Sequence, residues 1–192
     1  MGDDKKPKYV ITAALSPRYM SIMFNNKWCA SPDGMTAQEC AAVTQTMMSK
    51  QIFFGKVSNC YETVIDMRFF SQIKTLSYEM FGYSYVHGIL YCPPNLVSCG
   101  QQNVFRTTRC SRYYFPASVT KLGTGCAINT TGDFVFYSDT PPSDLGSNIS
   151  SMQAVYCPDD AIETYKASAG SYESRVHPIS EIGVGDVYKD FK

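Results

Sequence analysis

Eight cysteines are the feature that most constrains how this chain of 192 residues can fold. They are spread along the chain, at Cys29, Cys40, Cys60, Cys92, Cys99, Cys110, Cys126 and Cys157. An even number of cysteines is typical of an extracellular domain held by disulfide bonds, although spacing alone does not give the pairing. The count therefore predicts a disulfide-stabilised domain, and reduced thiols in a cytoplasmic protein are the alternative.

Two glycosylation sequons favour the extracellular interpretation. Asn129 precedes Thr130-Thr131, and Asn148 precedes Ile149-Ser150, so both asparagines are predicted glycan acceptors. Residues 1–8 are polar and carry no secretory leader, so the prediction is a mature or truncated chain of a secreted or surface glycoprotein. No apolar run approaches the length that a bilayer requires, so no transmembrane segment is expected.

Composition indicates one globular domain. Hydrophobic residues make up 44% of the chain and charged residues 18%, which is unlike a disordered sequence. We expect a flexible arm over residues 1–8, a single domain over 9–166 and an extended tail over 167–192. The formal net charge is zero, which argues against a nucleic-acid partner.

Hydrophobic periodicity predicts helices early in the chain and strands late. Thr36 and Glu39 have the spacing of a capping box, and apolar residues recur at helical spacing from Glu62 to Met80. Strands are predicted at 83–92, 104–115 and 152–157, with a hairpin turn at 130–133. No internal repeat is apparent. This order predicts an α+β fold, with an antiparallel sheet and two helices in the N-terminal half.

Catalytic and metal motifs are not recognisable in the sequence. The cysteines lack the close C-x-x-C pairing of zinc sites, so neither a metal nor a cofactor is predicted. His87 and His177 are the only histidines and could serve as a general acid and base, which leaves an enzyme as an open alternative.

The densest group of arginine and tyrosine is the predicted binding surface. It comprises Arg106, Arg109, Arg112, Tyr113 and Tyr114, and Trp28 in a loop is a second candidate. Such side chains concentrate binding energy because they bury large areas with little loss of entropy. The prediction is a binding domain, such as an effector, adhesion or ectodomain module, with a protein or glycan partner. A structural subunit of a larger oligomeric assembly and a small secreted hydrolase are the alternatives.

Overall fold

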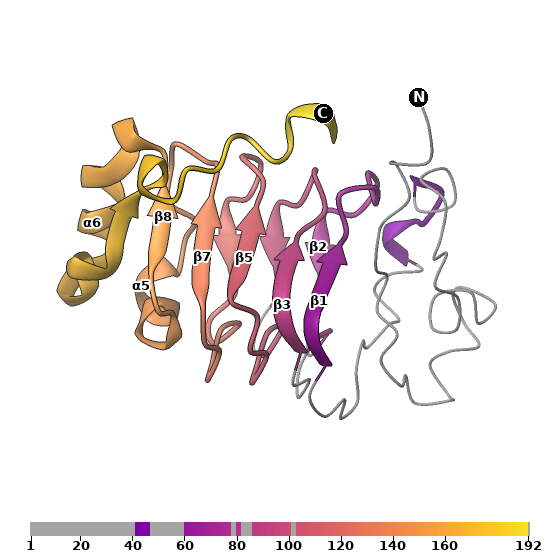
Figure 1. Ribbon diagram of the computed structural model, residues 1–192, viewed down its shortest axis with the longest axis horizontal. Coiled ribbons are helices and arrows are strands. Elements are labelled where there is room, and N and C mark those ends of the chain that lie inside the picture. Colours follow the sequence, from indigo (N-terminus) through magenta and orange to yellow (C-terminus); the bar gives the residue numbers. More distant parts are fainter. Residues whose placement is uncertain (1–40, 47–59, 78–79, 82–85, 101–102, 192) are drawn as a thin grey trace.

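The computed structural model describes residues 41–46, 60–77, 80–81, 86–100 and 103–191 (Figure 1). In it the chain winds repeatedly around one core and adds parallel strands at each turn; we call this winding arrangement the coil. One sheet has six strands in the order β1-β3-β5-β7-β8-β9, and a second has three short strands in the order β2-β4-β6. Every strand pair in these two sheets is parallel. From β1 to β7, successive strands alternate between the sheets, so each turn of the coil supplies one strand to each.

The six-stranded sheet contains β1 (Cys60–Asp66), β3 (Val86–Tyr91), β5 (Arg112–Phe115), β7 (Asp133–Phe136), β8 (Val155–Cys157) and β9 (Val176–Pro178). The three-stranded sheet contains β2 (Thr75–Leu76), β4 (Ser98–Cys99) and β6 (Lys121–Leu122). The helices that lie wholly within the described residues are α5 (Leu145–Asn148), α6 (Ile162–Ala169) and the 3-10 turns η1 (Ile149–Ser151), η2 (Asp159–Ala161), η3 (Gly170–Arg175), η4 (Ile179–Ile182) and η5 (Lys189–Phe191).

The coil has a nearly constant period. Leu90, Tyr113, Phe134, Val155 and Val176 are successive register partners in the large sheet, separated by 23, 21, 21 and 21 residues. All five side chains are buried in one core cluster. A chain that returns to the same position every twenty to thirty or so residues is a solenoid, in which each turn packs on its neighbours. The sequence shows no apparent internal repeat, but the structure does repeat, so the expectation of a chain without repeats is wrong.

Aromatic side chains fill the interior of the coil. The rings of Tyr113 and Phe134 stack at 4.6 Å between centroids, and those of Phe115 and Phe136 at 4.8 Å. These residues alternate along β5 and β7 with outward-facing residues, as the two-residue period of a strand requires. At the C-terminal end of the coil, α6 buries Tyr165, whose hydroxyl donates to the Ser138 carbonyl at 3.0 Å.

The turns before β5 and β7 are built alike. The hydroxyl of Thr108 donates to the carbonyl three residues earlier at 2.6 Å, and that of Thr130 does the same at 2.9 Å. At Gly132 neighbouring turns come so close that an added Cβ would lie 2.0 Å from the Cys110 carbonyl oxygen. Its φ of 124° is also one that other residues rarely adopt, so only glycine fits there.

The predicted α+β class with an antiparallel sheet is wrong. Residues 62–80 were expected to form a helix, but they contain most of β1 and all of β2. The chain turns over the core in this segment and buries every third residue, namely Phe70, Ile73 and Leu76. This spacing resembles the periodicity of a helix. The described helices α5 and α6 lie in the C-terminal half. The helix expected to begin at Thr36 falls mainly outside the described residues.

The predicted hairpin about residues 130–133 is also wrong. Residues 133–136 form β7, which pairs in parallel with β5 on one side and with β8 on the other. The turn-forming residues 130–132 connect two turns of the coil rather than two strands of a ribbon. Within the described residues no helix is long and apolar enough to cross a bilayer.

Disulfide stabilisation is not found in the described part of the chain. The cysteines whose side chains are described are all free and buried, namely Cys92, Cys99, Cys110, Cys126 and Cys157. They pack as small apolar side chains in the interior, a common role for a free cysteine. Cys29, Cys40 and the side chain of Cys60 lie outside the described part.

Candidate binding surface

The outer face of the six-stranded sheet carries a row of large side chains. Its members are register partners on adjacent strands, one from each of the six: Asp66, Tyr91, Tyr114, Val135, Tyr156 and His177. We call them the outer row. The Tyr91 and Tyr114 rings stack at 4.8 Å, and the Tyr156 ring lies 5.5 Å from the His177 ring. The coil thus places aromatic side chains from turns far apart in the sequence side by side.

The C-terminal segment, residues 179–191, returns across this face near the ends of the strands (Figure 1). We call it the strap. The Tyr188 side chain is only 2% exposed, and its hydroxyl donates to the Tyr114 carbonyl at 2.6 Å. The Tyr137 hydroxyl donates to the Gly185 carbonyl at 2.7 Å. The strap therefore covers the middle of the outer row with apolar contacts, with a buried hydrogen bond from Tyr188 and with an exposed one from Tyr137.

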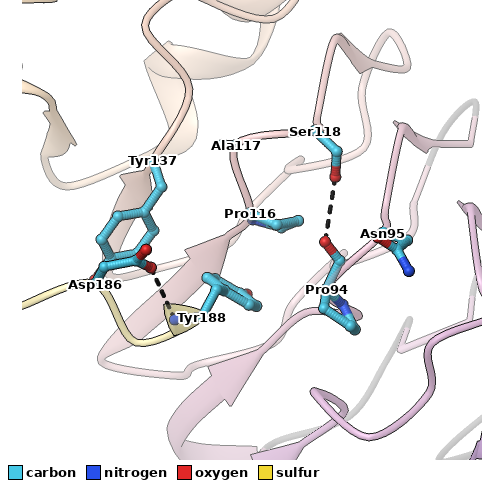
Figure 2. A pocket seen from close by; sticks show the side chains of 8 residues that line it. All are labelled: Pro94, Asn95, Pro116, Ala117, Ser118, Tyr137, Asp186 and Tyr188. Carbon is cyan, nitrogen blue, oxygen red and sulfur yellow. Dashed lines mark hydrogen bonds between the residues drawn. The ribbon is translucent and has the colours of Figure 1, made fainter. Parts of the chain in front are cut away.

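A pocket of about 300 Å³ lies where the strap meets the loops that follow β3 and β5 (Figure 2). Its lining residues are Pro94, Asn95, Pro116, Ala117, Ser118, Tyr137, Asp186 and Tyr188. Two prolines and two tyrosines make half of the lining residues, and Asp186 adds a carboxylate. The Asp186 Oδ1 atom accepts a hydrogen bond from the backbone N–H of Tyr188 at 2.9 Å. This bond fixes the turn of the strap at the edge of the pocket.

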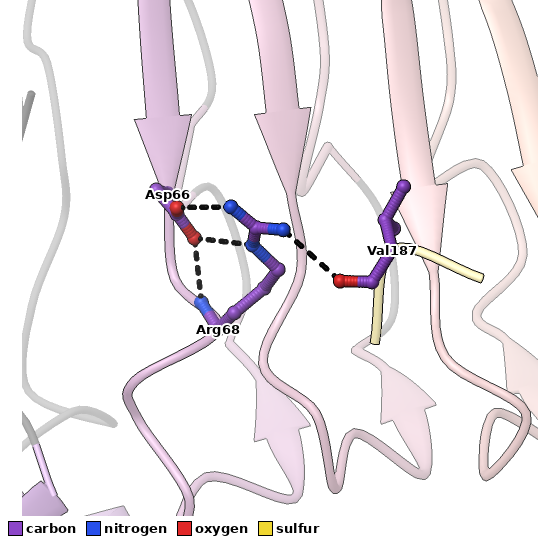
Figure 3. A network of polar contacts seen from close by, with 3 residues as sticks. All are labelled: Asp66, Arg68 and Val187. Atoms are coloured by element: carbon purple, nitrogen blue, oxygen red, sulfur yellow. Dashed lines mark hydrogen bonds and ion pairs between the residues drawn. The ribbon is translucent and has the colours of Figure 1, made fainter. Parts of the chain in front are cut away.

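Arg68 holds the end of the strap (Figure 3). Its guanidinium donates to both Asp66 carboxylate oxygens, at 2.9 Å and 2.6 Å, and to the Val187 carbonyl at 3.0 Å. It also lies over the rings of Tyr91 and Phe191, at 4.2 Å and 4.6 Å from their centroids. Burial lowers the pKa of Arg68, but the hydrogen bond and the negative charge of Asp66 raise it by more. The pKa of Arg68 is therefore raised above its ordinary value. The group remains a cation that joins β1 to the strap.

Part of the outer face is half-exposed. Arg112 Nη2 lies 3.6 Å from the Asp133 carboxylate on the next strand, and Arg112 Nη1 donates to the Tyr114 hydroxyl at 3.4 Å. His177 Nδ1 lies 3.3 Å from the Glu181 carboxylate. Tyr156 is half-exposed between these two groups, on β8. This open area offers aromatic surface and both signs of charge.

The structure separates the residues of the predicted binding cluster. Arg112 lies on the outer face, and Tyr114 shares that face but is 3% exposed beneath the strap. Tyr113 points into the core, where its hydroxyl pairs with that of Thr108 at 2.5 Å. Arg106 is half-buried and Arg109 exposed, both in the turn before β5. Trp28 lies outside the described residues.

Sequence reasoning missed the other large side chains that share this face with Arg112. Tyr91, Tyr156 and His177 lie on β3, β8 and β9, which are one or more turns of the coil away. A window along the sequence does not bring these residues together. One signal for them is the spacing of 21 to 23 residues, which links each strand of the large sheet to the next from β3 onwards.

The two sequon asparagines differ in environment. Asn129 is exposed in the turn before β7. Asn148 is 2% exposed in α5, and its side-chain nitrogen donates to the Gly123 carbonyl at 3.2 Å and to the Asp144 carbonyl at 2.9 Å. A glycan on Asn148 would require this amide to give up at least one of these bonds, because the sugar replaces one of the two hydrogens on the same nitrogen.

Reactive groups are held in unreactive states in the described part of the chain. Burial raises the pKa of the Cys110 and Cys126 thiols to about 12, whereas a nucleophilic cysteine needs a lowered pKa. No three His, Cys, Asp or Glu side chains of the described residues are grouped so that they could hold a metal ion. The predicted acid–base pair consists of His87 and His177, and the side chain of His87 lies outside the described part of the chain.

No family model matches this chain, and neither the curated proteins nor the solved structures contain a match.

Proposed function

We propose that this chain is a protein-binding module whose docking surface is the open part of the outer face. The observation that carries this proposal is the half-exposed group of Arg112, Asp133, Tyr156 and His177, held on four adjacent parallel strands. Backbone ladders on both sides fix β5, β7 and β8, and β9 is paired with β8 at the edge of the sheet. The side chains on these strands therefore lose little freedom when a partner covers them. Solenoids use such extended regular faces to bind other molecules.

The chemistry of this surface favours a protein partner. Tyrosine and arginine are enriched among residues that dominate binding energy, and Tyr156 and Arg112 are both half-exposed. Arg112 and Asp133 offer charges of opposite sign beside the aromatic ring, which suits a surface of mixed charge. A secreted or surface location remains part of the proposal through the Asn129 sequon, without disulfide bonds among the described cysteines.

Neither alternative from the sequence gains comparable support. The long tail favoured a structural subunit, but residues 179–191 pack on the sheet of the same chain. A hydrolase needs converging reactive groups, and the buried thiols with raised pKa do not provide them.

Site-specific crosslinking tests the proposal. A photo-crosslinking residue replaces Tyr156 in the full chain, which is then irradiated in an extract of the cells that express it. We expect one protein adduct of defined mass. The partner in that adduct, once purified, should bind the unmodified chain and lose about tenfold in affinity with Arg112→Ser.

The matched control carries the same crosslinking residue at Lys121, which is exposed on the other sheet. This position should not give the adduct, because it lies away from the outer face. The same adduct from both positions, or an affinity unchanged by Arg112→Ser, would contradict a docking surface on the outer face.

A further inference from the structure

The pocket beneath the strap is a composite of two parts of the chain. Pro94 and Pro116 come from the loops after β3 and β5, whereas Asp186 and Tyr188 come from the strap (Figure 2). Its volume of about 300 Å³ is at the lower end of the range for sites that bind small ligands or single side chains.

The hydroxyl donors in the pocket walls are already used within the protein. The Tyr137 hydroxyl donates to Gly185 and the Tyr188 hydroxyl to Tyr114. The Ser118 hydroxyl donates to the Leu96 carbonyl at 2.7 Å. A tyrosine or serine oxygen that has donated its one proton can still accept a hydrogen bond.

The Asn95 amide differs from the hydroxyls, because its side-chain nitrogen carries two N–H groups and its side-chain oxygen is an acceptor. One of these N–H groups donates to the Ser71 carbonyl at 2.8 Å, outside the pocket. Asp186 contributes a carboxylate, which accepts hydrogen bonds and carries a negative charge. The hydroxyl oxygens and the Asp186 carboxylate therefore offer acceptors and a negative charge among proline and tyrosine surfaces.

This combination selects a ligand with an apolar stem and a positively charged end. A lysine or arginine side chain has both, since its methylene groups pack on apolar surface while its cationic head seeks acceptors. The rings of Tyr137 and Tyr188, at 5.7 Å and nearly perpendicular, add surfaces that attract cations.

We propose that this pocket receives a lysine or arginine side chain of the partner protein. The identity of the ligand as a protein side chain rests on the proposed function, whereas the preference for a cation rests on the pocket alone. Because the strap forms one wall, an occupied pocket also stabilises the docked strap by mass action.

The experiment titrates the isotopically labelled full chain with three small probes and follows the ring resonances of Tyr137 and Tyr188. The probes are Nα-acetyl-lysine amide, Nα-acetyl-arginine amide and the uncharged Nα-acetyl-norleucine amide. We expect saturable shifts with at least one cationic probe, with an affinity at least about fivefold above that of the norleucine probe. The stronger of the two cationic probes identifies the preferred side chain.

The variant Asp186→Asn should weaken the cationic probe by about fivefold, because it removes the negative charge. Its side-chain oxygen can still accept from the Tyr188 N–H, so the turn of the strap is retained. Asp190→Asn is the matched control, since Asp190 is exposed on the strap but does not line the pocket, and it should leave the affinity unchanged.

Equal binding of the lysine and norleucine probes would overturn the proposal, and so would the absence of shifts or an Asp186→Asn variant with unchanged affinity. None of these results depends on Tyr156 or Arg112. If the crosslinking experiment fails while the pocket still binds a cationic probe selectively, the docking surface is contradicted and the cation preference of the pocket is supported.

Discussion

Thr107 is held in a conformation that its side chain disfavours. Its φ is 60°, in the left-handed region, where a β-branched side chain clashes with the backbone. The equivalent residue one turn later is Asn129, with a φ of 55°, and asparagine tolerates this region far better. The Thr107 hydroxyl is also buried without a hydrogen-bond partner. The turn before β5 therefore stores strain that the turn before β7 avoids.

Replacing this threonine should stabilise the protein. We expect Thr107→Gly to raise the free energy of unfolding by about 1 kcal/mol, because it removes the clash and the unsatisfied hydroxyl. Urea denaturation measures the change. Thr131→Gly is the matched control, since Thr131 is exposed and has no positive φ, and it should lower stability by about 0.5 kcal/mol. A loss of stability in both variants would show that Thr107 is not strained.

At the scale of elements, the strap depends on a few polar contacts over an apolar base. Arg68 is central because one guanidinium binds Asp66, the Val187 carbonyl and two aromatic rings. Lysine keeps the charge but lacks the planar fork that makes several bonds at fixed angles. The strap should therefore open more readily in Arg68→Lys, while the coil stays folded.

We expect Arg68→Lys to speed hydrogen exchange at the Tyr188 amide by about tenfold, which corresponds to about 1.4 kcal/mol of lost docking energy. Exchange at the buried Phe134 amide, bonded to the Ala154 carbonyl at 2.9 Å, should change far less. Arg109→Lys, at an exposed arginine before β5, serves as the control. Equal acceleration at both amides would mean that Arg68 stabilises the whole coil and not the strap.

Some strands could be predicted from the sequence, but their pairing could not. The ranges predicted at 83–92 and 152–157 contain β3 and β8, and the end of the range 104–115 is β5. Local alternation of apolar residues identifies such segments. It does not show whether the neighbouring strand runs parallel or antiparallel, since that depends on the path of the connection.

A repeat signal was nevertheless present. Tyr91-Cys92-Pro93, Tyr114-Phe115-Pro116 and Tyr156-Cys157-Pro158 each mark the end of a strand in the large sheet. In each case the tyrosine faces out, the next residue faces the core and the proline follows the strand. The intervening turn has Val135-Phe136-Tyr137 instead, and the first period is 23 residues whereas the next two are 21. A search for identical residues at identical spacing therefore misses the repeat.

The candidate site was predictable only in part for the same reason. Arg112 and Tyr114 share a face by strand alternation, as the sequence predicts. Their neighbours Tyr91 and Tyr156 come from other turns, and the strap that covers Tyr114 comes from the far end of the chain. Contacts across turns depend on the period of the coil, which local patterns do not contain.

At the scale of the whole molecule, stability should depend on buried groups that must stay protonated. Burial raises the pKa of Cys110 and Cys126 from 9.0 to about 12. In the unfolded chain these thiols ionise near pH 9, whereas in the folded chain they remain neutral until about pH 12. Between these values the unfolded state binds fewer protons, so its free energy falls relative to the folded state as pH rises.

We therefore expect the free energy of unfolding to be constant with respect to these thiols below pH 9 and to fall from pH 9 towards pH 12. Each buried thiol should contribute a slope of up to about 1.4 kcal/mol per pH unit. Urea denaturation at intervals between pH 8 and pH 11, under reducing conditions, measures this slope. In Cys126→Ala the slope of the unfolding free energy against pH should be smaller by the contribution of one thiol, because one titrating group has been removed. This expectation holds whatever the stability of the variant at neutral pH. An unchanged slope in that variant would mean that the Cys126 thiol already ionises at an ordinary pKa in the folded chain, and hence that the interior of the coil is open to water.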